Sequence, residues 1–466
     1  MASRSAEPVV DVVPLLERQK VGRFWLILFA VSWVVTFLDG FDLQIISFAG
    51  RYIQRSFALS NTELGTLGTI GVLGTLAGSI LMGYLGDLTG RKPAIVVSAA
   101  GFGVFTLAFA VAQDYPQLIA LRFATGVFLG GALPLIWALV TEFAPLRLRS
   151  TSVVITMIGY SFGSAAGGPL SNLLIPSFGW QSVFVAGGLA SLLAVIPVVL
   201  FLPESVKFLA QRDLRQHRIA PILRRALPET AFADGTRFTV GTGPRQRTSF
   251  TPAALFRGRT LAVVTPLIWL AYLSSSAIVF YLAFWGPILN ERIGFSVSQA
   301  ATLAAWASVA GAAGQLVAGR FIDRRGAGMI ALLPTLAVPC LLAIGLLPLS
   351  AAPYIVILLV SHALIIGGHG GVISVTGIFY PPAIRANGAG WATSVAKLGA
   401  MLGPWLAGFA LDHGVGVRGT FFVFAVFPIV MVVALVALGR VQRGLPAGAD
   451  GSMLTPVSTK EDRTAV

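Results

Sequence analysis

Long apolar stretches recur along the whole chain, and each is ended by a short polar break. About 20 predominantly apolar residues in a helix cross the hydrocarbon core of a bilayer. The pattern predicts twelve such helices, over residues 24–49, 64–86, 94–112, 116–140, 151–174, 180–202, 260–289, 299–319, 329–350, 353–378, 389–411 and 419–439. The chain is 56% hydrophobic and 11% charged, against about 25% charged residues in soluble domains, so we predict an all-α membrane protein.

A long polar segment separates the first six predicted helices from the last six. Residues 203–259 are basic and rich in Pro and Gly, so we predict a linker there, between a first six-helix bundle (24–202) and a second (260–439). Residues 1–23 precede the first bundle. Residues 440–466 are polar and lack periodic apolar positions, which predicts a disordered tail.

Positive charge is distributed unevenly between the two sides of the predicted bundles. An even number of helices places both termini on one side, and most of the 33 Lys and Arg residues lie in loops on that side. Those on the opposite side are Arg51, Arg55, Arg292 and Arg418. By the positive-inside rule, both termini and the linker are cytoplasmic. The net charge of +14 therefore reflects membrane topology, and no nucleic-acid partner is expected.

The sequence shows no recognisable grouping of enzyme or metal-binding residues. Cys340 is the single cysteine and lies in an apolar run, so neither a disulfide framework nor a cysteine metal site is expected. No nucleophile–base pair, phosphate-binding loop or set of metal ligands is recognisable. We therefore expect neither an enzyme nor a bound cofactor or metal.

The two predicted bundles are repeats of each other. Three sets of residues recur 236 positions later: Gly83, Asp87 and Gly90 as Gly319, Asp323 and Gly326; Pro145 and Arg149 as Pro381 and Arg385; Gly163 and Gly167 as Gly399 and Gly403. A constant offset over this length is hard to obtain by chance. It predicts that the second and eighth helices, and the fifth and eleventh, are structurally equivalent.

Several of these motifs resemble those of the major facilitator superfamily. They are GYLGDLTGRKP between the second and third helices, Arg122-x3-Gly126-x3-Gly130-Gly131 in the fourth, and Pro203-Glu204-Ser205 at the end of the sixth. The last of these is similar to the sugar and organic-ion branches. The resemblance implies two parallel six-helix repeats that pack around one central substrate cavity.

A narrower resemblance, to the aromatic acid:proton symporter family, rests on LDGFD in the first helix, Trp285-x-Pro287 in the seventh and YPPAIRANGAGWATSVAKLGAMLGP around the eleventh. It implies import of benzoates, hydroxybenzoates or hydroxyphenylpropionates across the inner membrane of a bacterium. In that family we expect Arg at the position of Lys397. Lysine keeps the charge but loses the planar, bidentate grip on a carboxylate.

Four charged residues lie inside the predicted membrane helices, namely Asp39, Asp42, Arg122 and Lys397. A charge in that environment is costly and marks function by default. Their counterparts at the 236-residue offset are uncharged: Ser275, Ile278, Leu358 and Ser161. The charges thus break the repeat that the glycines obey, which is the pattern of a site grafted onto a repeated scaffold.

Asp39 and Asp42 are three residues apart and share one helix face. Two carboxylates this close do not both ionise easily in a low dielectric, so the pair can load and release a proton. Arg122 can form a buried pair with this face, and breaking that pair on protonation would couple the proton to transport. Alternatively, one aspartate only caps a helix break at Gly40, or the pair with Arg122 is static.

Lys397 is the only cation in the predicted helix 389–411 and would supply the counter-charge for an anionic substrate. The alternative is a lysine that extends to the membrane surface. His362 and His369 are seven residues apart, hence on one face of the tenth helix. We place His369 among the candidate substrate contacts, but both histidines could instead relay protons or be ordinary core residues.

Aromatic and charged side chains complete the predicted site. Rings that could stack on an aromatic substrate are Phe41, Tyr281, Trp285 and Trp391. Lipid contact or anchoring at the membrane interface is the alternative for each. In the superfamily that this chain resembles, charges at the cytoplasmic helix ends gate the cavity, and the alternative is that they only orient the helices. The predicted gating residues are Asp87, Arg91, Glu142, Arg149, Glu204, Asp323 and Arg324.

Together these observations predict proton-coupled import of an aromatic monocarboxylate by a monomer whose partners are the substrate, protons and membrane lipid. Transport of another small organic anion, or drug export, is the alternative on the same fold. The fifth helix lacks the glycines after Pro169 that resemble antiporters, and Lys397 disfavours a cationic drug. A membrane sensor without transport is a third interpretation, which the asymmetric charges disfavour.

Overall fold

Long helices make up most of the computed structural model, which describes residues 9–17, 19–212, 216–233, 235–241, 251–325 and 330–443. Among these residues, eleven helices are long and apolar enough to cross a membrane, and Leu332–Leu346 is a shorter apolar helix. The first set is α2 (Arg23–Ser56), α3 (Asn61–Thr89), α4 (Arg91–Phe109), α5 (Tyr115–Phe143), α6 (Arg149–Phe178) and α7 (Gln181–Phe201). The second set is α10 (Arg259–Ile293), α11 (Val297–Arg325), α13 (Leu332–Leu346), α14 (Ala351–Phe379), α15 (Pro382–Asp412), and α16 (Val417–Phe424) with α17 (Val426–Arg443). The predicted all-α, twelve-helix architecture is confirmed.

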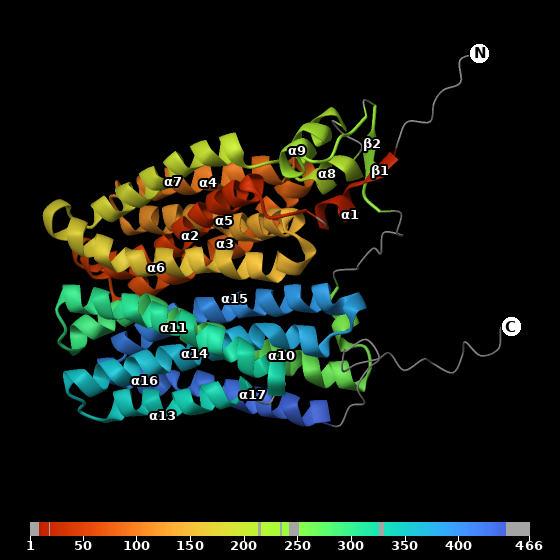
Figure 1. Cartoon of the computed structure of the whole chain (residues 1–466). Helices are drawn as coiled ribbons and strands as arrows, with labels where there is room; N and C mark the ends of the chain where they lie inside the picture. Colours follow the sequence, from red (N-terminus) through yellow and green to blue (C-terminus); the bar gives the residue numbers. More distant parts are fainter. Residues whose placement is uncertain are drawn as a thin grey trace, which may run out of the picture. The chain divides into compact units, whose positions relative to one another are not determined.

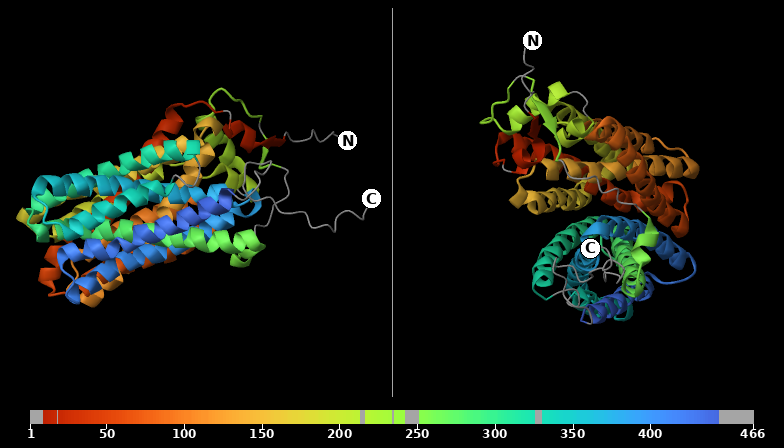
Figure 2. Two further views of the ribbon diagram at one scale, coloured as in Figure 1. Left: turned by 90° about the horizontal axis from the view of Figure 1, so that it is seen from below. Right: turned by 90° about the vertical axis from the view of Figure 1, so that its right-hand side faces the viewer.

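The chain divides into two compact units, each built around one set of helices. The first takes residues 1–59, 66–245 and 296–305, and the second takes 60–65, 246–295 and 306–466. Figure 1 shows α2 to α7 running alongside one another in the first unit. In the end-on view of Figure 2, the helices of the second unit are likewise roughly parallel. The predicted disordered tail, 440–466, is wrong at its start, because residues 440–443 continue helix α17, and residues 444–466 lie outside the described residues.

Glycines at equivalent positions bring equivalent helices together in the two units. A Cβ at Gly163 of α6 would collide with the carbonyl oxygen of Phe37 in α2. A Cβ at Gly399 of α15 would collide with that of Leu273 in α10. Both members of the second contact lie 236 residues after those of the first. Small residues let membrane helices approach this closely, so the repeat seen in the sequence is also a repeat of packing.

The membrane helices expose many large apolar side chains. Ile80 on α3, Leu193 on α7 and Val433 on α17 are 68%, 64% and 61% exposed. In water such side chains would favour association, whereas lipid tails are as apolar as they are, so their exposure costs little in a membrane. This exposure agrees with a multi-pass membrane protein.

A small lobe outside the membrane helices joins the N-terminal segment to the predicted linker. Strand β1 (Val9–Asp11) pairs in parallel with β2 (Arg237–Thr239), and helices α1 (Val12–Glu17), α8 (Val206–Gln211) and α9 (Ile219–Ala226) pack beside them. Buried apolar residues of these elements belong to the same core cluster as residues of the membrane helices; they include Val12, Leu16, Leu209, Leu223 and Phe238. We call this part the loop lobe, and the end of the first unit that carries it the loop end. The rest of the linker includes two short 3-10 helices, Gln216–Arg218 and Pro252–Phe256.

Candidate functional site

A buried ion pair joins helices α2 and α5 within the first unit. Arg122 Nη1 donates to Oδ2 of Asp42 at 2.8 Å, and the Arg122 and Asp42 side chains are only 8% and 2% exposed. Asp39 lies one turn before Asp42 on the same helix and is also buried. The contact that the sequence predicts between Arg122 and the aspartate face is therefore present, through Asp42.

This ion pair is incompletely satisfied. Asp42 Oδ1 and Arg122 Nε are buried, and neither finds a hydrogen-bond partner among the described residues. Moving two charges out of water is costly, and the attraction between them offsets that cost only when the remaining polar atoms are also bonded. A single bond in place of a bidentate one leaves the pair easier to open. Asp42 Oδ1 is thus an atom that could accept a proton inside the bundle.

Two glycines shape the surroundings of the pair. Helix α2 runs unbroken through Gly40, so no aspartate caps a helix break there, and that alternative is wrong. A Cβ at Gly40 would instead collide with the carbonyl oxygen of Tyr160 in α6, and a Cβ at Gly71 would lie 2.9 Å from Arg122 Nε. The Tyr160 side chain lies within electrostatic range of both aspartates. Gly40 and Gly71 therefore give α6 and Arg122 room to reach the carboxylates.

Lys397 lies at the midpoint of α15 in the second unit. The helix begins at Pro382 and ends at Asp412, so Lys397 is 15 residues from either end. At 1.5 Å per residue this is about 22 Å along the axis in both directions. The side chain is half-buried. This depth disfavours a lysine that reaches the membrane surface, because the helix starts seven residues earlier than the sequence predicts.

The two histidines of α14 have different surroundings. His362 is buried, and its Nδ1 lies 2.9 Å from the carbonyl oxygen of Leu358 on its own helix. His369 is half-buried, and its Nδ1 lies 3.0 Å from Oγ of Ser275 on α10. Ser275 is the counterpart of Asp39 in the repeat. The second unit thus joins its first and fourth helices by a histidine–serine contact, where the first unit uses the ion pair between Arg122 and Asp42.

The four predicted aromatic contacts are placed mainly by packing. Phe41 is buried against Gly187 of α7. Tyr281 is fully buried, stacks on Phe424 at 3.8 Å between ring centroids and shares a 2.8 Å hydrogen bond with Thr420. Trp285 is fully buried and donates from Nε1 to the carbonyl oxygen of Pro404 at 2.9 Å. Trp391 is half-buried and stacks on Trp269. Substrate contact by these rings stays a prediction.

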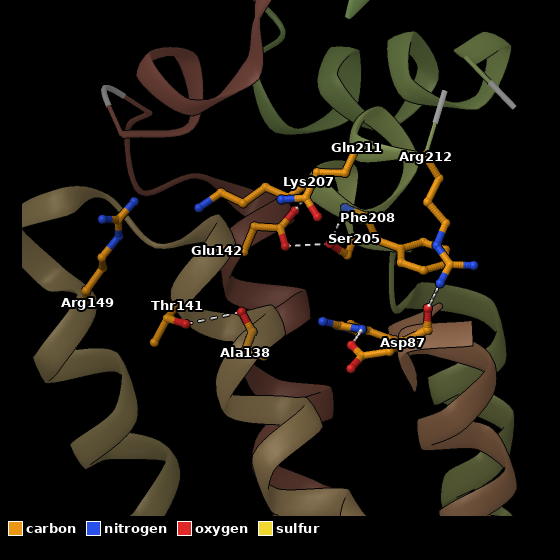
Figure 3. A pocket seen from close by; sticks show the side chains of 11 residues that line it. Asp87, Ala138, Thr141, Glu142, Arg149, Ser205, Lys207, Phe208, Gln211 and Arg212 are labelled. Carbon is orange, nitrogen blue, oxygen red and sulfur yellow. Dashed lines mark hydrogen bonds and ion pairs between the residues drawn. The ribbon is translucent and has the colours of Figure 1, made fainter. Parts of the chain in front are cut away.

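Predicted gating residues of the first unit gather at its loop end (Figure 3). Arg91 Nη1 contacts Asp87 Oδ1 at 2.6 Å and also donates to the carbonyl oxygen of Gly86 at 2.6 Å. Arg212 donates to the carbonyl oxygens of Asp87 and Leu88. These bonds tie the last turn of α3 to the start of α4 and to the loop lobe. The side chains of Asp323 and Arg324 lie outside the described residues.

Glu204 caps a helix that is distant in sequence. Its Oε1 accepts from the backbone N–H groups of Arg91 at 2.7 Å and Lys92 at 3.3 Å, at the start of α4. It also accepts from Ser205 N at 2.7 Å. The φ of Gly90 is +112°, and a Cβ there would collide with Oε2 of Glu204. The first N–H groups of a helix have no partner within it, so a carboxylate at this place stabilises the end of α4.

Removing this cap is expected to destabilise the first unit. Glu204→Ala leaves three backbone N–H groups without their acceptor, and we expect a loss of about 1–2 kcal/mol in the free energy of unfolding. Glu204→Gln retains one acceptor oxygen and should lose less. The measurement is the midpoint of thermal unfolding in detergent. The matched control is Glu229→Ala, because Glu229 is 83% exposed in its ion pair with Lys20. Equal midpoints for Glu204→Ala and the control would contradict the capping role.

Glu142 and Arg149 link the membrane helices to the loop lobe. Glu142 of α5 is buried and accepts from Ser205 Oγ at 2.6 Å and from Lys207 N at 2.9 Å. Arg149, at the start of α6, contacts Glu17 of α1 at 3.3 Å. Both predicted gating residues therefore hold elements of the loop lobe, and their gating role stays a prediction.

The residues of these clusters that sequence reasoning missed include Glu17 and Tyr160, and Ser205 was noted only as part of a motif and not as a cluster residue. Ser205 could have been found, since a Ser directly before an apolar run is a helix N-cap signal, and its Oγ indeed accepts from Phe208 N. Glu17 and Tyr160 carry no comparable signal, because each reaches its partners only through tertiary packing. Among the described residues, no group of three or more His, Cys, Asp or Glu side chains could hold a metal ion.

Known proteins resemble this chain over nearly its whole length. Residues 32–380 match the family model described as Major Facilitator Superfamily. The gallate transporter of Pseudomonas putida is 30% identical over 442 residues, which cover 94% of this chain and 97% of that relative. The 3-(3-hydroxy-phenyl)propionate transporter of Escherichia coli K12 is 33% identical over 390 residues, or 84% and 88% of the two chains. The inward-open structure of the xylose transporter XylE from E. coli has a TM-score of 0.72 at 17% identity, over 92% of this chain and 98% of that one.

Proposed function

This chain belongs to the Major Facilitator Superfamily, and we propose that it imports an aromatic monocarboxylate together with a proton. It is a membrane transporter and not an enzyme. Its relatives and the proteins that share its fold are also membrane transporters. In the proposed cycle, the site opens alternately to the two sides of the membrane, and protonation of the aspartate pair is linked to that change.

The ion pair between Asp42 and Arg122 is the observation that carries the proposal. Ionisable groups inside membrane helices are expensive and mark ion or proton pathways. Protonation of Asp42 would remove its attraction for Arg122, and the buried Oδ1 supplies the atom that takes the proton. Asp39 lies one turn away on the same buried helix, so a second carboxylate is close enough to share the proton.

The substrate class is inferred from the relatives and from Lys397. The two relatives described above transport gallate and 3-(3-hydroxy-phenyl)propionate, which are both aromatic carboxylates. Lys397, half-buried at the middle of α15, would supply the counter-charge for such an acid. His369 and the aromatic residues Trp391, Phe41, Tyr281 and Trp285 are further candidate contacts.

We infer a position in the inner membrane of a bacterium with both termini, and hence the loop lobe, in the cytoplasm. The support is the excess of Lys and Arg in the loops on the side of the termini. The predicted gating residues at the loop end would then close the cytoplasmic side of the transport path. Asp323 and Arg324 would take the equivalent role in the second unit.

Uptake by the purified protein in proteoliposomes tests the proposal. An imposed pH gradient, with the acidic side outside, should drive accumulation of a labelled benzoate-type acid, and a protonophore should abolish that accumulation. Unlabelled aromatic acids should compete, whereas cationic drugs should not. If only a non-aromatic organic anion accumulates, the protein transports another class of small organic anion. Export of a drug, or no transport of any solute, would overturn the proposal.

A further inference from the structure

A cavity of about 620 Å³ lies at the loop end of the first unit. Its walls come from α3, α4, α5, α6 and the loop lobe (Figure 3). Sites for small molecules commonly measure about 300–1,000 Å³, so the cavity is of suitable size. The charged residues that line it are Asp87, Arg91, Glu142, Arg149, Lys207 and Arg212.

Both acidic groups of the cavity are already engaged by neighbours. Asp87 pairs with Arg91 at 2.6 Å. Glu142 accepts from Ser205 Oγ at 2.6 Å and from the main-chain N–H of Lys207 at 2.9 Å. Among the described residues, neither carboxylate forms an ion pair within 4 Å with the ammonium of Lys207 or the guanidinium of Arg149, although Lys207 lies within electrostatic range of Glu142. The cavity keeps more positive than negative charge available to a ligand.

Two cationic side chains face the open space of the cavity. In Figure 3, Lys207 and Arg149 extend toward the same space from opposite sides. Arg149 donates from Nη2 to Oε1 of Glu17 in an ion pair at 3.3 Å. Lys207 makes no ion pair within 4 Å among the described residues, and Arg212 uses its donors on carbonyl oxygens. Two positive charges that face each other repel. An anion placed between them is attracted to both, and this attraction offsets the repulsion. The amide of Gln211 is a neutral donor in the same wall, whereas the hydroxyl of Thr141 already donates to the carbonyl oxygen of Trp137 at 2.6 Å.

We propose that this cavity is a second anion site, distinct from the pair formed by Asp42 and Arg122, which holds a small carboxylate or phosphate between Lys207 and Arg149. An anion there would compete with Glu17 for Arg149. It would therefore restrict the movement of a side chain that is predicted to gate transport. One consequence rests on the proposed function: acid accumulated in the cytoplasm would occupy this site and slow further import.

Binding by the purified full-length protein tests the site without any need for transport. The Lys397→Ala variant serves as the background, so that the proposed substrate site is weakened. Titration calorimetry is then performed with benzoate and, separately, with inorganic phosphate. We expect at least one of the two to bind, with an affinity that falls as salt concentration rises. Benzoate binding identifies an organic acid as the ligand, and binding of phosphate alone identifies an inorganic one.

Lys207→Gln is the decisive variant, because it removes the ammonium but keeps the main-chain N–H that bonds Glu142. We expect affinity to fall about tenfold or more, in keeping with the loss of one charge-assisted hydrogen bond. Lys20→Gln is the matched control, since Lys20 lies between α1 and α2 and is 84% exposed in its ion pair with Glu229, and it should change affinity little. Failure of both probes to bind, or equal affinities in Lys207→Gln and Lys20→Gln, overturns the second anion site.

The regulatory consequence has its own readout. Proteoliposomes of the otherwise unmodified protein, loaded inside with the ligand that binds, should take up labelled acid more slowly than empty ones, and Lys207→Gln should remove that difference. An equal slowing in Lys207→Gln would overturn the consequence. If no aromatic acid is transported at all, the proposed function fails while the binding result stands.

Discussion

Replacing Asp42 by Asn is expected to abolish accumulation of substrate driven by a pH gradient while leaving the protein inserted in membranes. Asn cannot bind and release a proton, so Oδ1 loses its proposed role. Arg122 also loses the charged partner that now lies 2.8 Å away. Asp39→Asn should abolish accumulation too, because we propose that the two aspartates share the proton. The measurement is the initial rate and the final level of uptake in proteoliposomes.

The matched control for these variants is Asp114→Asn. Asp114 is exposed and caps α5 by accepting from Gln117 N at 2.8 Å, and Asn caps a helix about as well as Asp. Accumulation by this variant should equal that of the unmodified protein. Accumulation at the unmodified rate by both Asp39→Asn and Asp42→Asn would show that the proton does not pass through this pair.

A double variant separates coupling from folding. Asp42→Asn alone leaves Arg122 as a buried charge without its partner, which typically costs about 3–5 kcal/mol of stability. Adding Arg122→Gln removes that charge, so the melting temperature in detergent should largely recover. Accumulation should not recover, because neither residue can then respond to a proton. Recovery of both would mean that the pair has only a structural role.

Most of the fold could be predicted from the sequence, because the bilayer leaves few solutions. A segment in lipid must satisfy its backbone hydrogen bonds internally, so each long apolar stretch becomes a helix. The helix ends were less predictable. Helix α2 continues to Ser56 and α15 begins at Pro382, each seven residues beyond the apolar stretch. A proline in the first turn of a helix loses no hydrogen bond, so Pro382 marks the true start of α15.

The charged centre of the site was visible in the sequence because charges are rare in membrane helices. Asp42 and Arg122 stood out for this reason, and the structure brings them together. The rotation of each helix about its axis is not encoded so plainly. Tyr281 and Trp285 lie in apolar helices where any face can be buried, and the structure places both in the core of the second unit.

The loop lobe could not be read from hydropathy. Its strands are three residues long, too short for an alternating pattern to stand out from a polar segment. Its N-terminal strand pairs with one more than 220 residues later, which no local signal reveals. The lobe depends on scattered apolar residues such as Leu16 and Phe238 that look isolated until the chain brings them together.

Removal of the Lys397 charge is expected to weaken binding of aromatic acids selectively. If the substrate carboxylate is held by this cation, Lys397→Ala leaves a desolvated anion without its partner, at a cost of about 2–5 kcal/mol. At about 1.4 kcal/mol per decade, that is a loss of roughly 30-fold or more in affinity. Lys397→Arg should keep partial activity, because the charge remains and guanidinium groups bind carboxylates in a bidentate manner.

Neutral analogues make this prediction specific to charge. Amides or esters with the same ring should bind the unmodified protein weakly and lose little in Lys397→Ala, because they do not use the cation. Acid and amide affinities should therefore respond differently to one substitution, as measured by competition with labelled acid. A lysine at the membrane surface predicts no such difference, and a cationic-drug exporter predicts tighter cation binding once a positive charge is removed. If Lys397→Ala binds the acid as well as the unmodified protein does, the carboxylate site at Lys397 is wrong, and the aromatic-acid assignment loses its main support within this chain.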